Sequence, residues 1–447
     1  MKKRVALLIP VLLMLGLVFP RPQAAQTTAD PQLVAEIAKI KAIDNHAHPL
    51  RFVAEGDKPD DEYDALPLEG LEPFALPPRV NPANPEYIGA WRALFGYKHD
   101  DMSETHMKEL VAAKQRVMRE RGDEYPVWVL DQIGIETMLA NRVAMGRGLK
   151  APRYRWVSFV DPLMVPLNNE AARRSNPDYR VFFAGEAKLL KRYLAESKVT
   201  ALAATLDEYL KGVVTATLER QKRDGAVAVK FEAAYLRSLD FDDAAESEAR
   251  RVYAKYAKGG EPPAVEYKAL QDYLFRYIAR EAGRLGLAVH IHAIDGAGSF
   301  YKQSGSNPLL LESAFNDPGL RKTNFVIVHG GYPFTKQTAS LMGKSNVYAD
   351  FSAQTFLLYP RALSDVLRNW LEYYPDKVLF GTDAFALTPE AGWEEGGWLA
   401  ITTARQALAL ALTGMMNDGE ITRERAVELA RMVMRDNAIK LYGLKSQ

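Results

Sequence analysis

The 447-residue chain contains no cysteine. Disulfide bonds, thiolate nucleophiles and sulfur ligands are therefore excluded, and any metal ion must be held by nitrogen and oxygen atoms. The chain also lacks an excess of charge, because 57 Lys and Arg residues against 56 Asp and Glu residues leave a formal net charge of +1. Such a balance offers no broad positive surface for phosphate backbones, and no RNA-binding, helix-turn-helix or zinc-finger pattern accompanies it. Nucleic acid is therefore not an expected partner.

The apolar run near the N-terminus is too short for a typical membrane span. It covers Ala6 to Phe19, 14 residues, whereas a membrane-spanning helix needs about 20. Basic residues (KKR) precede it and a polar stretch (RPQAAQTTAD) follows. This pattern is typical of a secretory signal peptide, which we expect to span residues 1–25, with an uncleaved signal anchor as the alternative. Export without disulfides predicts a periplasmic or secreted protein with no membrane contact beyond export.

The rest of the chain has the pattern of a barrel. Hydrophobic residues make up 48% and charged residues 25% of the sequence, as in a globular protein with a sizeable core. Apolar, β-rich segments alternate with helical stretches, which indicates a parallel sheet. Eight such strands fit a closed (β/α)8 barrel of the TIM type within residues 32–447. The predicted strands are Ala42–Asn45, Thr137–Ala140, Arg155–Val160, Ala226–Phe231, Leu287–Ile291, Asn324–Val328, Val347–Phe351 and Lys377–Phe380.

A doubly wound open sheet is the alternative fold. It is disfavoured because no Gly-rich dinucleotide loop follows the first strand. A long insertion follows it instead, over residues 49–131, and opens with Pro-rich and acidic stretches (GDKPDDEYDALPLEG, ALPPRVNPANP). Long insertions after barrel strands usually cover the active face, so we expect this one to act as a lid within the barrel domain.

Histidine and aspartate residues stand at the ends of the first, fifth, sixth and eighth predicted strands. They are His46 and His48 (IDNHAHPL), His292 (AVHIHAIDG), His329 (FVIVHGG) and Asp383 (VLFGTDAF). In a barrel these ends converge, and residues two apart on a strand point to the same side. Imidazole and carboxylate together suit zinc, with manganese, iron or cobalt as alternatives. Such a ligand set leaves room for a water molecule whose pKa the ion would lower to about 7, the nucleophile that a hydrolase needs.

With these residues the sequence resembles the amidohydrolase superfamily (amidohydrolase-related family 2), whose pattern is His-x-His after the first strand, His after the fifth and sixth, and Asp after the eighth. The resemblance spans nearly the whole mature chain. It is closest to the amidohydrolase-like domain found fused to glutamine-synthetase-like proteins of plants and fungi. The fragments that carry it are IDNHAHPL, SNPLLLESAF, VIVHGGYPFT, NVYADFS, VLFGTDAF, WLAITTARQAL and RDNAIKLYG.

The resemblance implies a role for each of these residues. His46, His48, His292 and Asp383 would be metal ligands, and His329 would complete the ligand shell or act as an acid/base. In many members the aspartate also takes a proton from the attacking water, which a general base must do. His329 would then polarise the scissile carbonyl.

Lys230, at the end of the fourth predicted strand (AVAVKFEAAY), bears on the number of metal ions. Binuclear members of the superfamily carry a carboxylated lysine there, whereas pairing with Glu232 or with a substrate carboxylate is the alternative. The branch that this chain resembles looks mononuclear, so we expect one ion, with a second only if Lys230 is carboxylated, and we assign Lys230 to substrate binding. His290, on the same strand face as His292, is expected to support a ligand or to lie hydrogen-bonded in the core.

Tyr235 and Arg237 follow the fourth predicted strand and are expected to bind the substrate. An arginine beside the metal would suit a carboxylate-bearing substrate through paired hydrogen bonds.

Together these features predict a metal-dependent hydrolase that acts on an amide, lactone or ester bond of a small molecule. A non-hydrolytic metal-dependent lyase, such as a decarboxylase, is one alternative, because relatives decarboxylate acids with the same ligand set. A degenerate barrel that acts as a binding protein is another, although the retention of all five site residues argues against it. Assembly into a homo-oligomer is left open.

Overall fold

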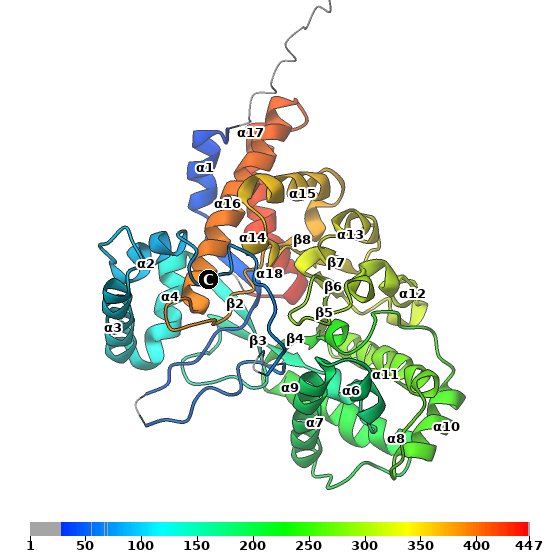
Figure 1. The fold of residues 1–447 in the computed structure, drawn as a ribbon. Coiled ribbons are helices and arrows are strands. Elements are labelled where there is room, and N and C mark those ends of the chain that lie inside the picture. The colour runs from blue at the N-terminus through cyan, green and yellow to red at the C-terminus, as the bar shows by residue number, and fades with distance from the viewer. Residues whose placement is uncertain (1–27, 55, 67, 69, 446–447) are drawn as a thin grey trace, which may run out of the picture.

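The computed structural model describes residues 28–445 except 55, 67 and 69. The predicted signal peptide, residues 1–25, therefore lies outside the described residues. Eight parallel strands run in the order β1 to β8, with helices around them (Figure 1). The predicted (β/α)8 barrel is confirmed, and each predicted strand overlaps an observed one. The strands are β1 (Ala42–Ala47), β2 (Ile135–Arg142), β3 (Tyr154–Phe159), β4 (Ala226–Phe231), β5 (Ala288–His292), β6 (Phe325–Val328), β7 (Val347–Asp350) and β8 (Val378–Leu379).

The barrel closes where the first strand meets the last. The backbone N–H of Asn45 donates to the carbonyl of Phe380 at 2.9 Å. The Asp44 carboxylate accepts from the backbone N–H and the hydroxyl of Thr382, at 2.9 and 2.6 Å. Burial raises the pKa of Asp44 to about 7, against the lowering effect of these hydrogen bonds. A buried acidic side chain thus joins the two ends of the sheet.

The barrel interior is filled by small and branched side chains, as close packing around a narrow axis requires. The C-terminal helix α18 (Asn437–Tyr442) contributes Ala438 to this cluster and closes one end of the barrel. The strand residues of the cluster are Ile43, Leu139, Val157, Ala228, Ala288, Val326, Val328 and Leu379.

Most helices cover the outside of the barrel, whereas the short α14 (Gln354–Leu357) follows β7 at the carboxyl end of the strands. The other helices outside the insertion are α1 (Pro31–Ala38), α5 (Asp161–Met164), α6 (Glu170–Ser175), α7 (Tyr179–Glu196), α8 (Leu206–Tyr209), α9 (Ala216–Arg223), α10 (Glu246–Tyr256), α11 (Ala264–Arg284), α12 (Glu312–Phe315), α13 (Thr335–Leu341), α15 (Pro360–Tyr373), α16 (Trp393–Asn417) and α17 (Arg423–Arg431). Among the described helices, α16 alone is long and apolar enough to cross a membrane, but 67% of its most apolar window is buried inside the fold. It therefore packs as a core helix.

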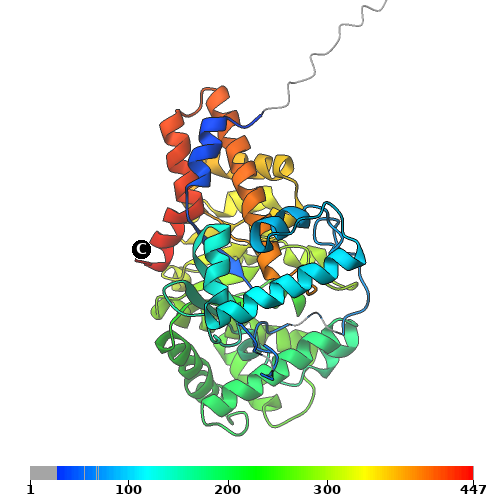
Figure 2. The same ribbon diagram turned by 90° about the vertical axis from the view of Figure 1, so that its left-hand side faces the viewer.

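The insertion after β1 contributes helices α2 (Tyr87–Phe95), α3 (Glu104–Arg121) and α4 (Tyr125–Ile133). Figures 1 and 2 show them grouped on one side of the barrel next to α16. Apolar side chains of α2 and α3, including Trp91, form a second hydrophobic cluster with residues of α16 and of the segments after β5, β7 and β8. The buried side chains of α4 join the main hydrophobic core instead. The insertion is therefore packed onto the barrel both by a cluster of its own and by the main core.

A buried ion pair reinforces this packing. Lys114 of α3 donates to both carboxylate oxygens of Glu395 on α16, at 2.8 and 2.9 Å. The two side chains are 6% and 0% exposed. Burial raises the pKa of Glu395 to about 7, although the lysine lowers it, so this carboxylate depends on its cation to stay charged.

We expect Lys114→Ala to lower the free energy of unfolding by about 3 kcal/mol, because it leaves a buried carboxylate without its partner. Chemical denaturation followed by circular dichroism measures this difference. Lys108→Ala is the matched control on the same helix, since Lys108 pairs with Glu104 at the surface, with side chains 75% and 84% exposed, and should leave stability unchanged. Equal effects of the two substitutions would contradict the anchoring role.

Candidate metal site and active-site pocket

An irregularity in β1 brings His46 and His48 into the mouth of the barrel. Ile43 faces the barrel interior, and strict alternation from it would turn positions 46 and 48 outward. The pairing of β1 with β2, however, contains one extra residue between positions 44 and 47. Such a bulge reverses the alternation, so both histidines line the pocket.

Two further site residues have a left-handed backbone. His329 has φ 66° and Asp383 has φ 56°, a conformation that costs a non-glycine residue about 1–3 kcal/mol. The turn at His329 lets its side chain enter the pocket directly after Val328, which already faces the barrel interior. Of the four non-glycine residues with positive φ in the described chain, three line this pocket, the third being Ala353. Backbone strain is therefore concentrated at this site.

Glycine is required beside both turned residues. Gly330 has φ 59°, and a Cβ there would collide with the Trp370 ring and lie 2.8 Å from the carbonyl oxygen of Asp350. Gly381, two residues before Asp383, approaches the neighbouring strand so closely that a Cβ would lie 2.8 Å from the Cβ of Ser352. These glycines let the chain turn where the site is built.

Three donor groups from the two ends of the chain meet at the bottom of the pocket. Asp383 Oδ1 lies 3.1 Å from His46 Nε2 and 3.6 Å from His48 Nε2, and the two Nε2 atoms are 3.3 Å apart. Ligands about 2.1 Å from a tetrahedral ion lie about 3.4 Å from one another, so the three spacings match a metal site. These residues are the group of donors that the described chain offers to a metal ion. Two imidazoles and a carboxylate fit a borderline divalent metal.

Burial dominates the electrostatics of the site. It raises the pKa of Asp383 to about 7 and lowers the pKa values of His46 and His329 well below the usual histidine range. His48 is the exception, because the carboxylates of Asp64 and Asp383 outweigh its burial and raise its pKa. The site thus combines two imidazoles that burial keeps neutral, those of His46 and His329, with a carboxyl group that burial disfavours as an anion. A bound cation would stabilise the ionised form of this carboxyl group.

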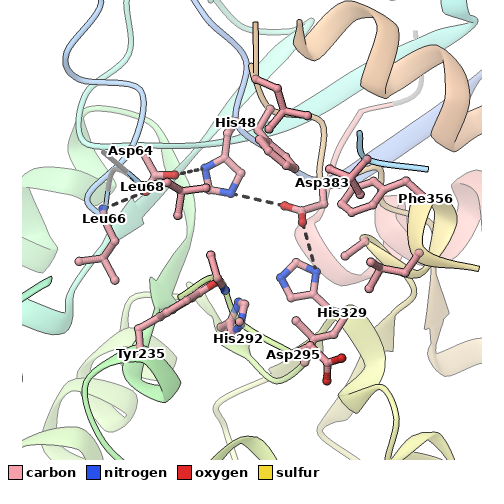
Figure 3. Close-up of a pocket in the computed structure, with 18 of the residues that line it drawn as sticks. His48, Asp64, Leu66, Leu68, Tyr235, His292, Asp295, His329, Phe356 and Asp383 are labelled. Atoms are coloured by element: carbon pink, nitrogen blue, oxygen red, sulfur yellow. Dashed lines mark hydrogen bonds and ion pairs between the residues drawn. The ribbon is translucent and has the colours of Figure 1, made fainter. Parts of the chain in front are cut away.

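Asp64, from the insertion, contacts the far side of the His48 ring. Its Oδ2 lies 3.0 Å from His48 Nδ1, while His48 Nε2 faces Asp383 (Figure 3). A carboxylate on the outer nitrogen fixes the orientation of a metal-binding imidazole. The sequence analysis missed Asp64, because it lies in an irregular segment 16 residues after His48; the acidic character of the stretch was the one signal available.

His329 is held by hydrogen bonds from behind. Its Nδ1 lies 2.9 Å from Ser352 Oγ, and its backbone N–H donates to Asp350 Oδ1 at 2.8 Å. The Ser352 hydroxyl donates in turn to the same Asp350 oxygen at 2.5 Å. The Nδ1 atom of His329 is 3.9 Å from Asp383 Oδ2. The ring of His329 is therefore fixed beside the three close metal donors.

His290 belongs to the same buried network but not to the pocket. Its Nε2 lies 2.7 Å from the Tyr442 hydroxyl, which donates to Asn45 Oδ1. Asn45 Nδ2 donates to Asp350 Oδ2 at 2.7 Å. The network therefore links the C-terminal helix through β1 to the residues that hold His329.

His292 lines the pocket but stands apart from the three close donors. Its Nδ1 is 3.4 Å from Glu232 Oε2, and its ring centroid is 4.8 Å from that of His329. Its buried Nε2 has no hydrogen-bond partner. The assignment of His292 as a further ligand stays a prediction, and this unpartnered nitrogen is what supports it.

Lys230 is paired with Glu232. Its Nζ donates to Glu232 Oε1 at 2.7 Å, and the backbone N–H of Glu232 donates to Asp161 Oδ2 at 2.7 Å. Both Lys230 and Glu232 line the pocket, as does Tyr235, whose ring centroid is 4.6 Å from that of His292. The substrate-binding roles of Lys230 and Tyr235 stay predictions.

The structure corrects the expectation for Arg237, which is not among the residues that line the pocket. The turn after β4 directs it toward α11, where its guanidinium donates to Asp272 at 2.7 Å and to Gln271 at 3.0 Å. It also lies over the Phe241 ring, 4.5 Å from the centroid. The guanidinium of Arg237 is therefore already paired outside the pocket. The prediction of a carboxylate-bearing substrate, which rested on Arg237, loses its basis.

The donor group lies at the bottom of a cavity of about 570 Å³. The polar floor comes from the ends of the strands, whereas much of the wall comes from the insertion and from the loops after β5, β7 and β8. Figure 3 shows His48, Asp383, His329 and His292 around this common space. Catalytic groups of TIM barrels stand at this end of the strands.

A family model, described as amidohydrolase, matches residues 156–444. This chain belongs to the amidohydrolase family. The family expected from the sequence is thereby confirmed. The match begins within β3, so His46 and His48 lie outside the matched residues. Their proximity to Asp383, which lies within the match, is seen in the folded structure.

Individual relatives of this amidohydrolase are distant. Protein fluG of Emericella nidulans is 26% identical over 235 residues, which cover 49% of this chain and 26% of fluG. The chain therefore spans about a quarter of that relative's length.

Solved structures share the fold at low identity. Glucuronate isomerase from Caulobacter crescentus has a TM-score of 0.63 at 14% identity, covering 95% of this chain and 97% of its own. A Lactobacillus casei protein assigned as a metal-dependent hydrolase has a TM-score of 0.60 at 15% identity, covering 93% and 98%. Because hydrolases and isomerases share this barrel, the reaction has to be argued from the site.

We expect His46→Ala to abolish stoichiometric zinc binding, because it removes one of three donors spaced for a single ion. Zinc content after dialysis, measured by plasma mass spectrometry, tests this. His99→Ala is the control, since His99 lies in the insertion and pairs with Glu109 at 3.0 Å. Full retention of zinc by the His46 variant would rule out this metal site.

We expect Asp64→Asn to weaken zinc binding by about 10- to 100-fold, the usual effect of removing a carboxylate behind a metal-binding histidine. Competition with a zinc-sensitive chelating dye measures the affinity. Asp295→Asn is the matched control, because Asp295 also lines the pocket. If both substitutions change the affinity equally, Asp64 acts through net charge and not through His48.

Proposed function

We propose that this amidohydrolase is a zinc-dependent hydrolase that cleaves an amide, lactone or ester bond of a small molecule. The observation that carries the proposal is the spacing of His46, His48 and Asp383 at the bottom of a cavity, with donor atoms 3.1 to 3.6 Å apart. His292 would be a further ligand. A bound divalent ion supplies electrophilic activation and lowers the pKa of a coordinated water.

Asp383 and His329 are the residues proposed to handle protons and charge. Asp383 directs Oδ1 to the two histidines and keeps Oδ2 on the side of His329, 3.9 Å from its Nδ1. An oxygen in that position can take a proton from the nucleophile, as general-base catalysis requires. His329, held by Ser352 and Asp350, is the residue that we propose to polarise the carbonyl of a substrate.

The isomerase reaction named for one structural neighbour, glucuronate isomerase, is a less suitable proposal. Glucuronate is a sugar acid, with a carboxylate and several hydroxyl groups that a binding site has to satisfy. Lys230 is the one lysine or arginine among the described lining residues, and Glu232 already pairs with it. Decarboxylation stays the main alternative, and carbon dioxide release would reveal it.

The N-terminal pattern supports a second proposal, export to the periplasm or the exterior. Fractionation of a host that expresses the full chain would test it.

We expect the zinc-loaded protein to hydrolyse members of a panel of amides, esters and lactones, and to lose this activity with a chelator. His329→Asn should lower kcat by about 10²- to 10⁴-fold, the usual contribution of a positioned acid/base group, with zinc content unchanged. Loss of zinc from this variant would instead make His329 a ligand. A zinc-loaded protein that hydrolyses nothing in the panel would refute the proposed function.

A further inference from the structure

We propose that the substrate is a neutral molecule with an apolar body, an alkyl- or aryl-bearing amide, ester or lactone. The inference rests on the proposed function for the bond that is cleaved, and on the wall of the pocket for the rest of the molecule. It replaces the carboxylate-bearing substrate expected from Arg237.

One wall of the pocket is apolar and rigidly supported. It contains Val80 of the insertion, Phe356 of α14, and Ile294, Phe385 and Leu387 of the loops after β5 and β8. The rings of Phe356 and Phe385 are in edge contact, with centroids 5.9 Å apart. All five side chains belong to, or pack against, the cluster that joins the insertion to the barrel. A preformed apolar surface of this kind favours an apolar ligand.

This wall begins at the reacting groups. Figure 3 shows Phe356 beside Asp383, and Leu66 and Leu68 beside Asp64 and His48. A substrate whose reacting carbonyl lies at the donor group therefore has its body against these apolar side chains.

Two apolar side chains at the mouth of the pocket remain partly exposed. Leu68 and Leu76 line the pocket and are each 37% exposed. Large exposed apolar residues that rim a cavity usually mark the place of an apolar ligand. The mouth and the wall of the pocket therefore both favour an apolar ligand.

The charges of the pocket disfavour an anionic substrate. Four carboxyl groups line it, those of Asp64, Glu232, Asp295 and Asp383, against the single ammonium group of Lys230. The proposed divalent ion would be engaged by the reacting carbonyl, and Lys230 is paired with Glu232. A carboxylate elsewhere on the substrate would therefore be buried without a free cationic partner, which is unfavourable.

Two arginines near the pocket are already satisfied and do not line it. Arg79 donates to Glu86 at 2.7 and 2.8 Å. Arg142 donates to Asp60 at 2.7 and 2.9 Å. Neither guanidinium is available to pair with a substrate anion.

A matched pair of metal-binding probes tests the inference. Octanohydroxamate and suberic acid monohydroxamate share the hydroxamate head and the chain length, and differ in a terminal methyl against a terminal carboxylate. We expect octanohydroxamate to bind the zinc-loaded full chain at least about tenfold more tightly in calorimetry, because the terminal carboxylate would be desolvated without a partner. Equal affinity, or tighter binding of the carboxylate probe, would overturn the inference.

A substitution at the mouth tests whether the apolar residues cause the preference. Leu76→Glu should weaken the binding of octanohydroxamate by about fivefold or more through the loss of apolar contact. Because the Leu76 side chain is partly exposed, the variant is expected to fold. Val265→Glu is the control, because Val265 is 83% exposed and does not line the pocket. An unchanged affinity in the Leu76 variant, or an equal loss in both variants, would count against the inference.

A metal-free measurement separates this inference from the proposed function. Nile red, a neutral apolar dye, should bind the zinc-free protein and lose fluorescence in Leu76→Glu but not in Val265→Glu. If the protein retains no zinc or hydrolyses nothing while the dye result holds, the proposed function fails and the inference on the pocket stands. If the protein hydrolyses the panel but the dye does not bind, or ignores the Leu76 substitution, the inference fails alone.

Discussion

The contact between β1 and β8 is the constraint on which the rest of the site depends. The Asp44 carboxylate holds Thr382 across a separation of 338 residues, and the backbone N–H of Asp383 donates to the carbonyl of His46 at 2.7 Å. Closing the barrel therefore places a carboxylate from the segment after the last strand directly against the histidines at the end of the first. A closed barrel leaves no free edge, so this register cannot slip without breaking the sheet elsewhere.

The site is strained locally, and the barrel supports that strain. The left-handed residues His329 and Asp383 would each favour another backbone conformation. The bonds from His329 to Asp350 and from Asp383 to His46 compensate at both positions. Asp350 is itself fixed by Asn45. Strain of this kind persists where surrounding contacts over-determine the geometry, and it keeps the polar groups in place before a ligand arrives.

The pocket divides its tasks between the barrel and its additions. Strand ends provide the polar floor, which suits a metal and a reacting bond, whereas the insertion and the loops provide an apolar wall. Lys114 and the second hydrophobic cluster hold the insertion against α16. Asp64 then couples the two parts, because a residue of the insertion orients His48 of the barrel. Changes in the insertion can therefore alter both the substrate and the metal affinity.

The sequence by itself determined the strands, their parallel order and the residues that stand at their ends. Apolar, β-rich segments that alternate with helical stretches carry that information locally, so all eight predicted strands overlap observed ones. The same pattern allowed the polar residues at the strand ends to be selected together: His46, His48, His292, His329 and Asp383. Glycines such as those beside His329 and Asp383 are typical of turns.

Only the tertiary structure decided how these side chains point and what they touch. The bulge in β1 depends on its pairing with β2, and the partner of His48 comes from an irregular segment whose path no periodicity encodes. Arg237 shows the same limit, because a long charged side chain takes whichever carboxylate its surroundings bring within reach, here Asp272. Local patterns determine which elements form, whereas partners depend on distances between elements that are established only when the barrel closes.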